Sequence, residues 1–133
     1  MTTSTNNNRL HQIGWILSGL AILALLGDAT VNIFFNEMLR ETMEAEGFPA
    51  ALAPAIGILS FTCAVVYAIP RTAVLGAILT TGFFGGAISI HFRLGEMGSP
   101  PQFISLAIAA LAWGGLYLRD PRVRALMPLR ARA

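Results

Sequence analysis

PRTAVLGAILTTGFFGGAISIHFR, residues 70–93, is the segment that decides the fold of this chain. It opens with a proline and an arginine, continues for about twenty apolar or small residues without a charge, and closes on His91 and Arg93. Twenty residues of α-helix at about 1.5 Å each measure about 30 Å, which is the thickness of the hydrocarbon core of a bilayer. We therefore predict that this segment is a transmembrane helix.

Small residues recur along one face of this predicted helix. Gly82, Gly86 and Ser89 follow one another at helical spacing, and Arg93 continues the same face. In an apolar helix, a face of small residues lets a second helix approach closely. We expect the other hydrophobic segments to pack against the helix at Gly82, Gly86 and Ser89.

Three further hydrophobic segments are long enough to cross a bilayer, and none shows the alternation of a strand. The sequence therefore predicts an all-α fold, a transmembrane four-helix bundle in which the polar connections lie outside the hydrocarbon core. The predicted spans cover residues 10–35, 49–69, 71–92 and 102–118.

The two ends of the chain differ from this apolar domain, which we place at residues 10–119. Residues 1–9 are polar, and we expect them to be disordered. The apolar run after Arg9 could imitate a signal peptide, but it continues well past fifteen residues and no A-x-A cleavage site follows it. Residues 120–133 form an Arg-rich tail.

Composition supports a membrane protein over a soluble bundle. Of the 133 residues, 55% are hydrophobic and only 12% are charged, against about a quarter charged in a typical soluble domain. A chain of this length cannot bury so much apolar surface in a core of its own. The length allows a single domain in contact with the lipid bilayer.

Arginine predicts the orientation of the spans. All nine basic residues are arginines, and their clustering beside hydrophobic spans differs from the basic, aromatic-rich face of a nucleic-acid-binding protein. By the positive-inside rule, both termini should be cytoplasmic, which predicts a multi-pass protein of the bacterial inner membrane. Only Arg40 and Arg93 flank the predicted outer ends, whereas the inner ends carry Arg9, Arg71, Arg119, Arg122, Arg124, Arg130 and Arg132.

Few residues point to metal or nucleophile chemistry. Cys63 is the single cysteine, so it cannot form a disulfide within the chain, and its apolar neighbours indicate an inert packing residue. His11 and His91 fall on opposite sides of the predicted membrane, so they cannot share a haem or a metal ion within one chain. The sequence predicts no metal site and no cofactor held by the chain itself.

Asp28 is the most informative single residue because a charge within a transmembrane helix costs about 2.5–3.5 kcal/mol on insertion scales. The distance along the helix from Leu10 to Asp28 is about 27 Å, which places the carboxylate in the outer part of the membrane. Asn32 follows one helical turn later on the same face.

His91 and Arg93 should reach the same depth from the third span, and Glu96 follows in the next loop. A pair of Asp28 with His91 or with Arg93 is therefore geometrically feasible. Since two residues subtend about 200° on a helix, His91 and Arg93 should point to different faces unless the helix end frays. Together with Asn32, these residues form either an outward-facing polar ligand site or an ion pair that joins the first and third spans.

Several phrases of the sequence resemble the DoxX-like family of small bacterial four-helix membrane proteins. The longest are PRTAVLGAILTTGFFGGAISIHFRLG (70–95) and LAWGGLYLRDPRVRALMPLR (111–130), and IGWILSGLAILALLGDATVN (13–32) and GFPAALAPAIGIL (47–59) are similar too. The family name comes from a small subunit of an archaeal thiosulfate:quinone oxidoreductase. The resemblance implies a membrane redox partner, with a quinone as the associated cofactor, but assigns no catalytic residue.

Three functions remain open from the sequence. The first is a non-catalytic subunit or interaction protein that supports quinone-linked redox chemistry, bound to a membrane redox partner or to copies of itself. The second is a small-ligand binder or transporter that uses the polar site at Asp28, His91 and Arg93. The third is an enzyme with Asp28 and His91 as acid and base, which requires the two side chains to lie within hydrogen-bond reach.

Overall fold

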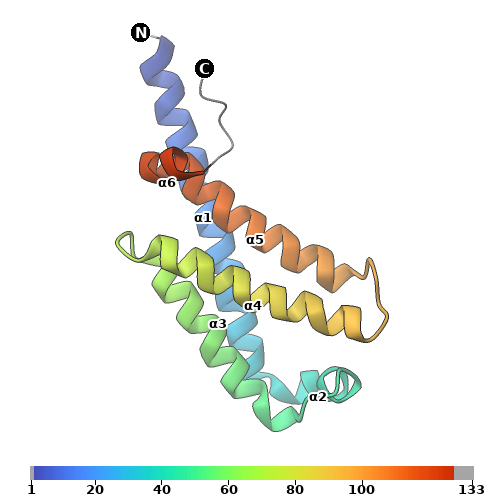
Figure 1. The fold of residues 1–133 in the computed structure, drawn as a ribbon. Coiled ribbons are helices and arrows are strands. Elements are labelled where there is room, and N and C mark those ends of the chain that lie inside the picture. Colours follow the sequence, from blue (N-terminus) through green and yellow to red (C-terminus); the bar gives the residue numbers. More distant parts are fainter. Residues whose placement is uncertain (1, 128–133) are drawn as a thin grey trace.

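A computed structural model describes residues 2–127, and the described chain is helical with no strand. Four segments are long and apolar enough to cross a membrane, as the sequence predicts: α1, η1 with α3, α4, and α5. The elements shown in Figure 1 are α1 (Thr2–Phe34), α2 (Asn36–Ala45), the 3₁₀ turn η1 (Ala50–Leu52), α3 (Ala53–Ala68), α4 (Ala73–Arg93), α5 (Pro100–Arg119) and α6 (Pro121–Leu126).

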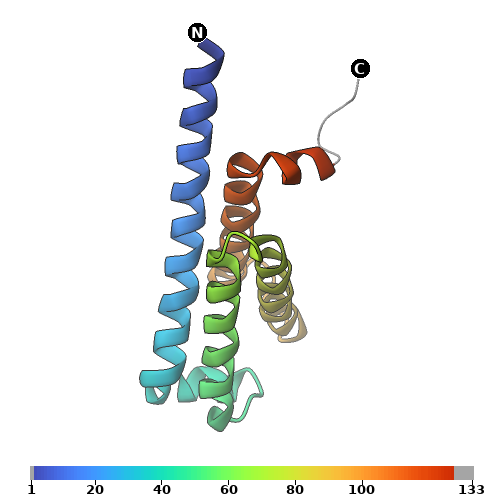
Figure 2. The same ribbon diagram turned by 90° about the vertical axis from the view of Figure 1, so that its left-hand side faces the viewer.

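The first helix begins earlier than the sequence suggests. Residues 1–9 were expected to be disordered, yet α1 already starts at Thr2 and projects beyond the other helices (Figure 2). Nucleation is the costly step of helix formation, so a helix formed by the apolar segment extends into polar residues at little further cost. At the other end, α6 occupies part of the predicted tail, while residues 128–133, with Arg130 and Arg132, lie outside the described residues.

The four long helices form a ring in which each packs on two neighbours. Helix α1 packs on α3 and α5, and α4 packs on the same two helices, so α1 and α4 stand at opposite corners. Helices α4 and α5 run obliquely to α1 and α3 (Figure 1). Helix α6 and the start of α1 lie at one end of the bundle, and α2 lies at the other end (Figure 2).

Glycines mark the points where these helices come closest. A Cβ atom on Gly115 would lie 2.5 Å from Ser18 Oγ, so α5 approaches the backbone of α1 at this point. A Cβ on Gly57 of α3 would lie 3.0 Å from the Ala29 carbonyl oxygen of α1. A Cβ on Gly76 of α4 would lie 2.3 Å from the backbone nitrogen of Tyr67. Close approach at small residues is how membrane helices gain van der Waals contact.

The small-residue face of α4 does not take part in these contacts. Added Cβ atoms on Gly82 and Gly86 would meet no atom within 4 Å, and Ser89 is exposed. The expectation that other helices of the chain pack there is therefore not met. Helix α4 packs against the neighbouring helices through a different face, on which Ala73, Gly76, Ala77, Thr80 and Phe84 are buried.

Tyr67 lies at the centre of the bundle. Its side chain is fully buried in the core. Its hydroxyl is hydrogen-bonded to Ser18 Oγ (2.9 Å) and to the Ala112 carbonyl oxygen (2.7 Å). These two bonds connect α3 with α1 and α5, and they satisfy a polar group that the apolar core would otherwise penalise.

Candidate functional site

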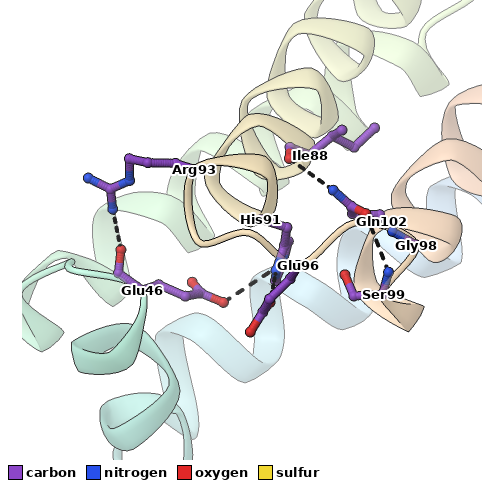
Figure 3. A network of polar contacts seen from close by, with 8 residues as sticks. All are labelled: Glu46, Ile88, His91, Arg93, Glu96, Gly98, Ser99 and Gln102. Carbon is purple, nitrogen blue, oxygen red and sulfur yellow. Dashed lines mark hydrogen bonds and ion pairs between the residues drawn. The ribbon is translucent and has the colours of Figure 1, made fainter.

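His91 is the centre of a polar cluster at the end of α4 that faces α2 (Figure 3). The residue is buried, and its Nδ1 lies 2.8 Å from Glu96 Oε2. On the other side of the ring, Nε2 lies 3.9 Å from Glu46 Oε1. The imidazole therefore stands between two carboxylates, one from the loop after α4 and one from the end of α2.

Arg93 also contacts Glu46, but through the backbone of that residue. Its Nη2 donates a hydrogen bond to the Glu46 carbonyl oxygen, while His91 faces the Glu46 side chain (Figure 3). The two side chains leave α4 in different directions, as the helical angle predicts, but the long arginine bends over the α2–η1 turn. The turn itself needs Gly47, whose φ of 82° is unfavourable for residues with a Cβ.

A pocket of about 280 Å³ opens beside this contact. Arg93 and Ser89 are the polar residues of its lining, and both belong to the open face of α4. Phe48 and Ile90 supply apolar walls, and Gly47 completes the lining. The pocket therefore combines one guanidinium with a mainly apolar surface.

Gln102 ties the loop between α4 and α5 to the end of α4. Its Nε2 donates to the Ile88 carbonyl oxygen at 3.4 Å, and its Oε1 accepts from the backbone nitrogens of Gly98 (2.8 Å) and Ser99 (3.3 Å) (Figure 3). These bonds hold the loop that carries Glu96 against α4.

Asp28 belongs to a second polar cluster, between α1 and α3. The side chains of Ser60 and Asn32 lie beside its carboxylate. Asn32 Nδ2 donates to the Asp28 carbonyl oxygen at 2.9 Å, and Ser60 Oγ donates to the Leu25 carbonyl oxygen at 3.0 Å. Asp28 Oδ2 is enclosed and has no hydrogen-bond partner among the described residues.

The structure thus divides the predicted site into two parts. His91, Arg93 and Glu96 meet at the α4 end through Glu46, whereas Asp28 and Asn32 face Ser60. No hydrogen bond or ion pair of the described chain joins Asp28 to His91 or Arg93. The reason is the order of the helices, since α1 and α4 stand at opposite corners of the bundle.

Comparison with known families covers most of the chain. Residues 16–115 match the DoxX-like family. The chain belongs to the DoxX-like family. No curated protein and no solved structure matches it. The part shared with the DoxX-like family contains both polar clusters and ends before Arg119 and α6.

The geometry limits the chemistry open to this DoxX-like protein. His91 with Glu46 and Glu96 can hold or exchange a proton, and Arg93 can donate hydrogen bonds to an oxygen in the pocket. No group of three His, Cys, Asp or Glu side chains among residues 2–127 is arranged to hold a metal ion. Because Asp28 and His91 are apart, the acid–base pair considered from the sequence is not assembled in this arrangement.

Three residues of these clusters were missed from the sequence. Glu46 is one of several acidic residues of the α2 region, and nothing in the sequence distinguishes it from Glu37, Glu41 or Glu44. Ser60 was recognisable as a hydroxyl in the middle of a span, a residue type that often bonds across membrane helices. Gln102 was recognisable as an amide one turn inside a helix that follows a Gly/Pro loop.

Proposed function

We propose that this DoxX-like protein is a non-catalytic membrane subunit or interaction protein that supports quinone-linked redox chemistry in a membrane partner. It spans the bacterial inner membrane with both termini in the cytoplasm, as the distribution of arginine favours. The quinone link is an analogy with the family, whose name comes from a subunit of a quinone-reducing enzyme.

The open face of α4 is the observation that supports an interaction role. Cβ atoms on Gly82, Gly85 and Gly86 would meet nothing within 4 Å, and Ser89 is exposed on the same helix. Small residues let the backbones of two membrane helices approach closely, which favours their association. None of the described helices packs on this face, so it is free to receive a helix of the redox partner.

Co-purification from native membranes in mild detergent tests this proposal. Gly86→Leu places a bulky side chain on the face, and Gly27→Leu is the matched control because Gly27 of α1 is equally open. We expect the wild type and Gly27→Leu to retain a partner protein with a quinone-dependent redox activity, and Gly86→Leu to lose it. Retention of the partner by Gly86→Leu would contradict the role of this face, and assemblies made only of this chain would assign the face to self-association.

The pocket beside Arg93 favours a second candidate function, the binding of a small ligand. A guanidinium next to Phe48 and Ile90 suits a flat apolar molecule that carries a hydrogen-bond acceptor, such as a quinone headgroup. Asp28 does not line this pocket, so it takes no part in this second candidate function.

Thermal unfolding of the purified protein with a short-tailed quinone tests this second candidate. We expect the quinone to raise the unfolding temperature of the wild type and of Arg40→Gln, which changes an exposed arginine of α2. Arg93→Gln should abolish the increase. An equal increase in Arg93→Gln would exclude the pocket as the binding site.

A further inference from the structure

Arg119, in the last turn of α5, is a buried cation without a hydrogen-bond partner among residues 2–127. Only 8% of the residue is exposed, and Nε and Nη2 are enclosed without a hydrogen bond to any described residue. The third nitrogen, Nη1, is not enclosed in this way. A guanidinium carries five N–H donors, and leaving them without acceptors in a dry environment is unfavourable.

Two aromatic rings flank this guanidinium. Its central carbon lies 4.3 Å from the centre of the Trp15 ring and 5.4 Å from the centre of the Tyr67 ring. Each ring is itself held by a hydrogen bond, because Trp15 Nε1 donates to His11 Nε2 at 3.1 Å and the Tyr67 hydroxyl is bonded within the core. Cation–π contact stabilises the charge but supplies no acceptor for the N–H groups.

The crossing of α1 and α5 positions the arginine. A Cβ on Gly14 would lie 2.8 Å from both the Arg119 backbone nitrogen and the Gly115 carbonyl oxygen. The end of α5 therefore rests directly on α1 at Gly14, and the next residue of α1, Trp15, covers the guanidinium. Trp15 is 44% exposed, so the arginine lies just beneath the outer surface of the bundle.

More positive charge follows at the same end of the bundle. Arg124 of α6 donates from Nη2 to the Leu118 carbonyl oxygen at 3.4 Å, and its Nε is enclosed without a partner. Arg122 is exposed on the same short helix. Helix α6 follows the span directly and is anchored by buried Val123, so these arginines lie at the boundary between lipid and water.

We propose that Arg119 binds the phosphate of an anionic phospholipid in the leaflet at the α6 end. A phosphate offers several anionic acceptor oxygens for charge-assisted hydrogen bonds, and Nη1 is the guanidinium nitrogen that is not enclosed. The acyl chains of the same lipid can lie along the apolar surface beside Trp15. Clusters of basic residues at the cytoplasmic ends of spans attract anionic lipids, and the arginine count favours this end as cytoplasmic.

Native mass spectrometry of the full-length protein, titrated with phosphatidylglycerol or phosphatidylcholine, tests the proposal. The wild type should retain phosphatidylglycerol in preference to phosphatidylcholine. Arg119→Gln should bind phosphatidylglycerol about tenfold more weakly, the loss expected when a hydrogen bond to a charged group is removed. Arg122→Gln is the matched control, because it removes the same charge from an exposed position, and it should weaken binding much less.

Three results would overturn the proposal. These are equal retention of the two lipids by the wild type, unchanged affinity in Arg119→Gln, and an equal loss in Arg122→Gln. Inorganic phosphate at the same concentration should not raise the unfolding temperature as phosphatidylglycerol does, and an equal increase would assign the site to a soluble anion. If Arg119→Gln does not fold, Arg119→Lys keeps the charge but loses the planar geometry, and undiminished binding by that variant would exclude recognition by the guanidinium.

Discussion

Gly76 shows how the absence of one side chain sets the distance between two helices. An added Cβ would lie 2.3 Å from the Tyr67 backbone nitrogen, a distance that real Cβ atoms do not reach. We predict that Gly76→Ala forces α3 and α4 apart and lowers the free energy of unfolding by about 1–3 kcal/mol, the usual cost of overpacking. Thermal or denaturant unfolding in detergent measures this change.

Gly82 provides the control for that experiment on the same helix. An added Cβ there meets no other atom within 4 Å, so Gly82→Ala removes only the backbone freedom of a glycine. We expect an unchanged or slightly higher stability, by about 0.5–1 kcal/mol. Equal effects of the two substitutions would show that the helices do not cross at Gly76.

Arg119 and Asp28 illustrate a second point at the level of single residues. Both place ionisable side chains among the predicted spans, and both have enclosed polar atoms without a described partner. Only Arg119 is covered on two sides by aromatic rings. The surroundings of the two side chains therefore differ, and the sequence does not display this difference.

The turn that follows helix α2 makes polar contacts with the end of α4, while α2 itself packs on η1, α1 and α3. His91 stands between Glu46 and Glu96, and Arg93 donates to the Glu46 carbonyl oxygen. Met43 is the residue of α2 that is buried against the rest of the chain. We expect the position of α2 to depend on the buried histidine in addition to its packing on η1, α1 and α3.

We predict that His91→Ala loosens α2 without unfolding the spans. Amide hydrogen exchange over Asn36–Ala45 and the loop at 94–99 should become faster, while exchange in the middle of α3 stays slow. Glu96→Gln is the milder comparison, because the Glu96 side chain is 52% exposed and a contact to so exposed a group contributes at most about 1 kcal/mol. Unchanged exchange over α2 in His91→Ala would show that other contacts hold the helix.

The arrangement of the whole molecule allows its orientation to be tested directly. Helices α2 and α6 lie at opposite ends of the bundle (Figure 2), so single cysteines placed on them report opposite sides of the membrane. In a Cys63→Ser background, we predict that a membrane-impermeant maleimide labels Glu41→Cys in intact cells. Arg122→Cys should react only after the cells are opened.

Both positions are exposed, so a difference in labelling reflects the membrane and not burial. Labelling of Arg122→Cys in intact cells would place α6 outside and contradict the orientation derived from arginine. It would also move the Arg119 site to the outer leaflet, where the positive-inside rule no longer supports a cytoplasmic lipid.

Much of the helix layout was predictable from local sequence. Uncharged runs of about twenty residues locate the spans, and Pro54 and Pro100 stand in the first turns of α3 and α5, where proline is well tolerated. His91 and Arg93 at the end of α4 were also identifiable as candidates, because they close a long run of residues without a charge. Their partners were not, since the link to Glu46 depends on how α2 folds back.

The sequence by itself determined that four helices are long and apolar enough to cross a membrane, and which helices follow one another closely. Only the tertiary structure decided which faces meet, so that Gly76 and Gly115 lie in contacts while Gly82 and Gly86 remain open. It also separated Asp28 from His91 by placing α1 and α4 at opposite corners. The physical reason is that lipid and protein core are both apolar, so hydrophobic periodicity does not distinguish a buried face from a lipid-facing one.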